Sequence, residues 1–124
     1  MKPVMQTKFG DPEGNCFEAS IASYLGIPLE DVPVMAPMRT DMNVFWATLL
    51  EWLQEHHGLC LVRAPSKGTW VPPGVYHLIG GLGPRGLRHA GVGKGGVLVH
   101  DPHPEGGGLL EDSYWFFVPS EGGE

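Results

Sequence analysis

Apolar side chains in the first half of the chain recur at the three- and four-residue spacing of amphipathic helices. One such run predicts a helix over residues 16–25, which Gly26 and Pro28 would end. A second run predicts a helix over residues 42–57, which Gly58 would end. The apolar positions that carry the two patterns are Phe17, Ile21, Tyr24 and Leu25 in the first, and Phe45, Trp46, Leu49, Leu50 and Leu53 in the second.

From Gly58 onwards the helical spacing gives way to short apolar runs bounded by glycine and proline. Such runs are typical of strands joined by turns. Lys94, Gly95 and Gly96 separate two of the runs and fit a hairpin connection. Helices followed by strands indicate an α+β protein, with the N-terminal helices packed on a four- to five-stranded antiparallel sheet. The predicted strands are residues 59–64, 75–79, 88–92, 97–101 and 114–118.

The composition indicates one turn-rich domain over residues 1–124. The chain has 19 Gly and 12 Pro among 124 residues, so turns are frequent, and 42% hydrophobic residues are enough for a core. The net charge of −6 argues against a nucleic acid as a partner. The acidic balance and the four Trp residues favour a peptide or protein partner instead.

Membrane and secretion signals are not evident in the sequence. The chain has no run of about 18 apolar residues, the length of a membrane span, so we expect no membrane association. Its beginning lacks the apolar region of a secretory signal. We therefore expect a cytoplasmic protein in which Cys16 and Cys60 are free thiols. The sequence does not indicate an oligomeric state.

Cys16 begins the first predicted helix, directly after Asn15. Free backbone N–H groups and the positive end of the helix dipole favour a thiolate at this position. Asn15 is a suitable N-cap, and Glu18 can complete a capping box with it. The same Glu18 places negative charge near the thiol and opposes its ionisation. Cys16 is therefore a candidate nucleophile that needs a base as its partner.

His89 is the candidate base, because it opens a predicted strand and Asp101 ends the next one. A hairpin of these two strands would bring both side chains to the same end of the sheet. A cysteine nucleophile needs a base for its proton, and a carboxylate on the second ring nitrogen fixes the tautomer of that base. Gln6, ten residues before Cys16, can donate to an oxyanion. The sequence thus predicts a catalytic set of Cys16, His89, Asp101 and Gln6.

The remaining chemistry-bearing side chains have structural interpretations. His56 and His57 lie at the end of the second predicted helix, where cations suit the dipole. His77 lies within a predicted strand and is interpreted as structural. Cys60, between two leucines, is predicted to belong to the core, as is Trp46.

This order of residues resembles the papain-like cysteine peptidase superfamily, and within it the C39-like branch. The chain is also similar to small proteins of bacterial and phage genomes. The resemblance implies a papain-like fold in which Cys16 is the nucleophile, His89 the general base and acid, and Asp101 the residue that orients His89, with Gln6 as oxyanion donor. The matching residues are Gln6, Gly14-Asn15-Cys16-Phe17 at a helix start, His89 at a strand start and Asp101-Pro102 at the end of the next strand.

The residues and the resemblance together predict a thiol-dependent hydrolase that cleaves an amide bond through an acyl-enzyme on Cys16. A peptidase is the first interpretation, but an amidase, a deamidase and an acyl transferase share the same intermediate. We expect Asn15, Trp70 and His103 to contact the substrate, Trp70 because its polar loop has little else to bury. No organic cofactor and no metal is implied.

Two other functions stay open at this point. His100, Asp101 and His103 form a compact cluster that could bind zinc together with Cys16 or His89. Adjacent strand residues point to opposite faces, which argues against one ion shared by His100 and Asp101. The same fold could also serve as a non-catalytic module that binds a peptide or protein.

Overall fold

The two helices form where the hydrophobic spacing predicts them. The computed structural model describes residues 1–120 and contains α1 (Cys16–Leu25) and α2 (Met42–His57). Gly26 and Gly58 end the helices with φ of 72° and 63°, a left-handed conformation that glycine adopts without steric cost. No helix within the described residues is long and apolar enough to cross a membrane. Two 3-10 turns, η1 (Leu29–Asp31) and η2 (Ala36–Met38), connect the helices.

The second half of the chain forms one five-stranded antiparallel sheet with the strand order β1-β5-β2-β3-β4. The last strand, β5, is inserted between β1 and β2. The predicted hairpin between β3 and β4 is confirmed, with Gly95 and Gly96 in its turn. The strands are β1 (Leu59–Pro65), β2 (Tyr76–Leu82), β3 (Arg88–Lys94), β4 (Val97–His100) and β5 (Leu110–Pro119).

β1, β2, β3 and β5 are longer than their apolar runs predict, β2 and β5 most of all, whereas β4 ends at His100 rather than at residue 101. β5 begins at Leu110 rather than at residue 114, and β2 continues to Leu82 rather than ending at residue 79. In these extensions Gly81 pairs with Glu111, and Leu82 pairs with Leu110. Backbone pairing between the two strands holds this part of the sheet. A prediction based on apolar runs misses it, because its residues include glycine and acidic residues.

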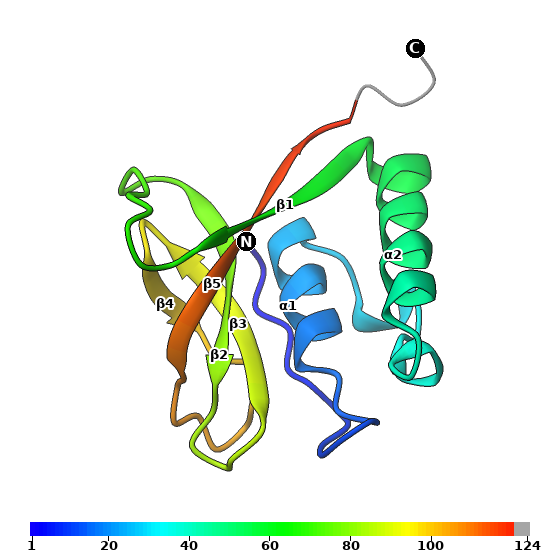
Figure 1. Cartoon of the computed structure of the whole chain (residues 1–124), viewed down its shortest axis with the longest axis horizontal. Coiled ribbons are helices and arrows are strands. Elements are labelled where there is room, and N and C mark those ends of the chain that lie inside the picture. Colours follow the sequence, from blue (N-terminus) through cyan, green and yellow to red (C-terminus); the bar gives the residue numbers. More distant parts are fainter. Residues whose placement is uncertain (121–124) are drawn as a thin grey trace.

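Both helices lie on one side of the sheet, and the main core lies between them and the strands. α1 packs on β3 and β2, and α2 contacts β1. Figure 1 shows α1 between the sheet and α2. Full burial of a large apolar side chain contributes about 1.5–3 kcal/mol to stability. The buried residues of this core are Ile21, Ala22, Val32, Met35, Phe45, Leu49, Leu53, Leu78 and Val92.

The first residues of the chain are fastened to α1 and to the end of β4. The N–H of Val4 donates to Ser23 Oγ at 2.8 Å, and the carbonyl of Val4 accepts from His100 Nε2 at 2.8 Å. The N–H of Gln6 donates to the carbonyl of Pro102 at 2.9 Å. These bonds bring Gln6 beside the residues that follow β4.

Candidate functional site

A cleft of about 680 Å³ opens between the start of α1, the end of β2 and the start of β3. Three of the four predicted catalytic residues, Gln6, Cys16 and His89, line it, and so does His103. Asp101 does not line the cleft but is hydrogen-bonded to His89. The fold therefore gathers residues from the N-terminal segment, α1 and the β3–β4 hairpin at one cleft.

Cys16 is the first residue of α1 and is partly buried in the cleft wall. Burial raises the pKa of its thiol, and the nearby Glu18 carboxylate raises it further. The backbone N–H of Ala90, the charge of Arg39 and the N–H of Phe17 lower this pKa without cancelling the effect of burial. The sequence-based expectation that Glu18 opposes ionisation of the thiol is confirmed, and burial adds to this effect and outweighs the backbone groups that favour a thiolate. Because its pKa is raised, the Cys16 thiol needs a base to become a nucleophile.

Glu18, two residues after the candidate nucleophile, is buried and paired with Arg39. Arg39 Nη2 and Glu18 Oε1 are 2.7 Å apart, and the Glu18 side chain is only 5% exposed. Arg39 also donates to the carbonyl of Pro12 at 3.3 Å. The predicted capping box of Asn15 and Glu18 is wrong, because the carboxylate serves this ion pair instead. A buried carboxylate without such a partner would carry a large desolvation cost.

Asn15 precedes α1, but its side chain does not cap the helix. Its Oδ1 accepts from the N–H groups of Thr7 and Lys8, both at 2.9 Å, and its Nδ2 donates to Thr7 Oγ1 at 3.0 Å. The amide thus ties the segment that follows Gln6 to the start of α1. Asn15 is not among the residues that line the cleft, so the structure gives it this positioning role and does not bring it to the predicted substrate contact.

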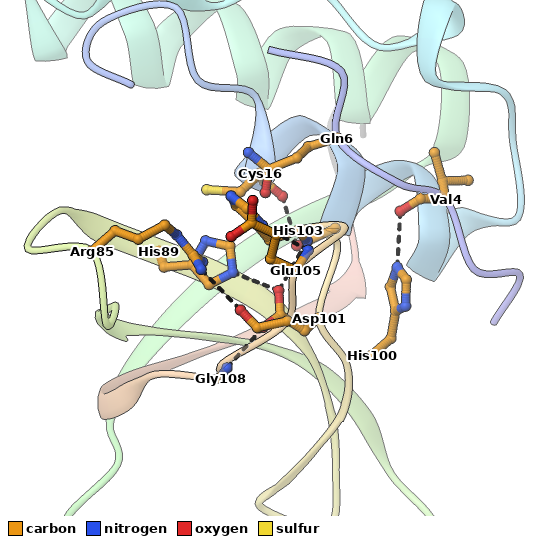
Figure 2. Close-up of polar contacts among 12 residues, drawn as sticks. Val4, Gln6, Cys16, Arg85, His89, His100, Asp101, His103, Glu105 and Gly108 are labelled. Carbon is orange, nitrogen blue, oxygen red and sulfur yellow. Dashed lines mark hydrogen bonds and ion pairs between the residues drawn. The ribbon is translucent and has the colours of Figure 1, made fainter. Parts of the chain in front are cut away.

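His89 and Asp101 meet as the hairpin prediction requires. His89 Nε2 and Asp101 Oδ1 are 2.7 Å apart, and their side chains are 6% and 13% exposed (Figure 2). Within the described part of the chain, His89 Nδ1 has no hydrogen-bond partner, the Cys16 thiol included. The ring therefore keeps one nitrogen on the carboxylate and the other available to a group in the cleft.

Asp101 is held ionised by its hydrogen bonds. Burial acts to raise its pKa, but the bonds from His89 and from the N–H groups of His103 and Gly108 together hold the pKa below its usual value. The two backbone bonds are each 2.9 Å long, one to Oδ1 and one to Oδ2. An ionised carboxylate at Nε2 keeps the proton of the neutral ring on that nitrogen, which leaves Nδ1 as a proton acceptor.

The amide of Gln6 is buried at the cleft and only partly used. Its Nε2 donates to the carbonyl of Lys8 at 3.0 Å, which leaves one of its two N–H groups for another acceptor. Its Oε1 is buried without a hydrogen-bond partner in residues 1–120. An unpaired buried acceptor costs about 1–3 kcal/mol, a cost that an N–H of a bound molecule would remove.

The other two predicted substrate contacts differ in their placement. His103 lines the cleft, and its ring lies edge-to-face against the ring of His89 with centroids 6.2 Å apart. Trp70 is 80% exposed and precedes the beginning of β2, whereas the cleft lies at the end of that strand. The structure therefore brings His103, but not Trp70, to the site.

The surroundings of His77 and Cys60 test the structural roles that the sequence predicts for them. His77 is fully buried, its Nδ1–H donates to the carbonyl of Leu78 at 2.9 Å, and its Nε2 accepts from the N–H of Gly96 at 3.0 Å. Its structural role is confirmed. Cys60 is a free thiol that is only partly buried on the edge strand β1, so its assignment to the core was wrong.

The zinc hypothesis required His100, Asp101 and His103 to converge. The side chain of His100 instead turns away from Asp101 to the carbonyl of Val4 (Figure 2). Among residues 1–120, no group of three or more His, Cys, Asp and Glu side chains could hold a metal ion. The described part of the chain thus offers no ligand set for zinc.

Aromatic side chains that the sequence did not predict at the site form walls of the cleft. Trp46, predicted to be a core residue, lines the cleft together with Trp115. The ring centroid of Phe17 lies 6.1 Å from that of Trp46 and 5.6 Å from that of Trp115. A Cβ on Gly80 would lie 2.6 Å from Trp115, so glycine allows this indole to lie against β2. Helical spacing gives no signal for Trp46, because a residue facing a core and one facing a cleft recur at the same intervals.

The chain was also compared with protein-family models, with curated proteins and with solved structures, and none of them matches.

Proposed function

We propose that this protein is a thiol-dependent hydrolase of papain-like fold. Cys16 is the nucleophile, His89 the general base and acid, and Asp101 the residue that orients His89. The observation that carries the proposal is the 2.7 Å His89–Asp101 bond beside a cysteine that opens a helix and lines the same cleft as His89. The order of helices and antiparallel strands supports the papain-like assignment. A peptidase is the preferred activity among the amide-cleaving reactions that share an acyl-enzyme.

Acylation uses Nδ1 of His89, the ring nitrogen that is not bonded to Asp101. His89 Nδ1 takes the proton of the Cys16 thiol while Sγ attacks the carbonyl carbon of the amide, and the carbonyl electron pair moves onto oxygen. The unused N–H of Gln6 is the donor proposed for this oxyanion. The C–N bond then breaks, and His89 gives the proton to the leaving amine. The raised pKa of the Cys16 thiol makes this proton transfer necessary rather than optional.

Deacylation uses the same residues with water. His89 takes a proton from water as the water oxygen attacks the thioester carbon, and the C–S bond breaks. His89 then returns the proton to the sulfur, so one water is consumed and a carboxylic acid and an amine are released. Asp101 stays ionised throughout and stabilises the imidazolium that forms in both steps.

A competition between the two thiols tests the proposal. Iodoacetamide near neutral pH should alkylate Cys16 much faster than Cys60, because only Cys16 has His89 as a base. The substitution His89→Ala should slow the alkylation of Cys16 by roughly tenfold or more. Peptide mass spectrometry over time measures both rates in one sample.

The matched control is His56→Ala, which removes an exposed imidazole at the end of α2. It should leave the alkylation rate of Cys16 unchanged. Equally slow labelling of both thiols, or a rate at Cys16 that is indifferent to His89→Ala, would overturn the proposed function. An inert Cys16 would favour a non-catalytic module that binds a peptide or protein.

A further inference from the structure

Three arginines line the cleft, and they differ in their partners. Arg39 is paired with Glu18, and Arg88 is paired with Asp112. Arg85 has no carboxylate partner within residues 1–120. In a chain of net charge −6, this is a positive charge that the protein leaves uncompensated at the rim of its cleft.

The guanidinium of Arg85 is held in place but keeps most of its donors. Its Nη1 donates to the carbonyl of Gly106 at 3.0 Å. A guanidinium has five N–H donors in a fixed planar arrangement, which suits a carboxylate. This single protein bond fixes the side chain on the loop that follows β4 and leaves the remaining donors for a ligand.

His103 supplies a second donor from the same loop. Its Nδ1 accepts from the N–H of Glu105 at 3.0 Å, so the proton of the neutral ring lies on Nε2. The carbonyl of His103 accepts from the N–H of Gly106, the residue whose own carbonyl holds Arg85. One turn over residues 103–106 thus carries His103 and fastens Arg85 (Figure 2).

Few carboxylates compete for these donors. Asp11 is the one carboxylate among the described residues that line the cleft. Glu105 belongs to the same turn as His103, but it does not line the cleft and forms no ion pair with Arg85. The donors at this wall are therefore available to an anion from solution.

Exposed apolar side chains lie around the same cleft. Phe9, Met42, Leu82 and Leu87 are each 46% or more exposed, and all four line it. Exposed apolar groups that gather around a single concavity indicate a binding site for an apolar group. The cleft therefore combines an apolar rim with one uncompensated cation.

We propose that the cleft selects substrates in which a carboxylate lies next to an apolar side chain, with Arg85 and His103 as the carboxylate donors. This inference rests on the proposed function, because it names the substrate class of that same site. We therefore expect tight binding when the acyl or amine portion of the substrate is an amino acid with an apolar side chain and a free carboxylate. The corresponding substrate with a neutral amide in place of this carboxylate should bind less well.

Two matched reagents test the inference, bromoacetyl-leucine with its free carboxylate and bromoacetyl-leucinamide. Each alkylates a thiol by forming an S–C bond and expelling bromide, and the thiol proton goes to His89 or to solvent. The ratio of the carboxylate rate to the amide rate at Cys16 should exceed the ratio at Cys60 by roughly tenfold. Arg85→Gln should reduce the Cys16 ratio to the Cys60 value, and His103→Gln should reduce it in part.

The control Lys67→Gln removes one positive charge from an exposed loop residue that does not line the cleft, and it should keep the preference of the wild type. Equal ratios at Cys16 and Cys60 in the wild type, or a loss of preference in Lys67→Gln as large as in Arg85→Gln, would overturn the inference. Failure of the proposed function looks different, because iodoacetamide would then alkylate Cys16 no faster than Cys60.

Discussion

His77 and His89 are buried histidines on neighbouring strands, and their hydrogen bonds separate their roles. Both ring nitrogens of His77 are bonded to backbone groups, so this ring has no free position for chemistry. One ring nitrogen of His89 is hydrogen-bonded to Asp101, and the other has no hydrogen-bond partner among the described residues. A residue type and its burial are the same in both cases, and only the partners distinguish a structural imidazole from a candidate base.

The buried ring of His77 makes the stability of the protein depend on pH. Burial lowers the pKa of His77 in the folded chain, against an ordinary value of about 6.5 in the unfolded chain. Below that value the unfolded chain binds a proton that the folded chain does not, so acid favours unfolding. We expect the free energy of unfolding to fall by up to about 1.4 kcal/mol per pH unit between pH 6.5 and pH 5 from this residue.

Urea denaturation at pH 7 and at pH 5 measures this effect. His77→Gln should reduce the difference between the two pH values even if the variant is less stable at both. His56→Gln, which removes an exposed imidazole, should keep the difference of the wild type. An unchanged pH dependence in His77→Gln would show that other groups cause the acid sensitivity.

At the level of elements, the sequence predicted most where a pattern and a stop signal coincide. The bounds of α1 and α2 were predicted correctly because apolar spacing ends at Gly26 and Gly58. The extension of β5 was missed because Glu111 and Asp112 interrupt its apolar pattern while its backbone still pairs with β2. Strand pairing over long sequence distances leaves no periodic trace in either segment.

The candidate site, like the fold, could be predicted from the sequence only in part. His89 and Asp101 could be placed together in advance because a hairpin brings them to one end of the sheet, whereas Cys16 was related to them by its chemistry and by the order of the residues. The pairing of Glu18 with Arg39 and the exposure of Trp70 depend on how η2 and the β1–β2 loop cross the molecule. No spacing rule in one sequence contains that information.

The close approach of β2 and Trp115 sets one wall of the cleft and can be tested by substitution. In Gly80→Ala the new Cβ would lie 2.6 Å from the indole, so Trp115 must move. We expect a loss of about 1–3 kcal/mol in unfolding free energy and slower alkylation of Cys16, because Phe17 next to it packs on the same indole.

Urea denaturation and iodoacetamide labelling of Gly80→Ala measure the two effects. Gly74→Ala is the matched control, since a Cβ there meets nothing within 4 Å. A stable Gly80→Ala protein with the labelling rate of the wild type would show that the indole has room to move without altering the site.

At the scale of the whole molecule, the cleft lies where the helical layer meets one end of the sheet. The N-terminal segment reaches it through the bonds of Val4 and Gln6, α1 brings Cys16, β3 brings His89, and Asp101 directly follows β4. No single element contains the site. A function for this cleft therefore depends on the packing of the layers as well as on the individual side chains.

The central claim is that Cys16 forms an acyl-enzyme that water then hydrolyses. Reaction with p-nitrophenyl acetate tests it most directly, with peptide mass spectrometry to locate the acetyl group and absorbance to follow p-nitrophenol. We expect the acetyl group on Cys16 and not on Cys60, with p-nitrophenol release that continues beyond one equivalent in the wild type and slows strongly in His89→Ala. Acetylation of both thiols to the same extent, or a release rate unchanged in Cys16→Ser, would contradict the account.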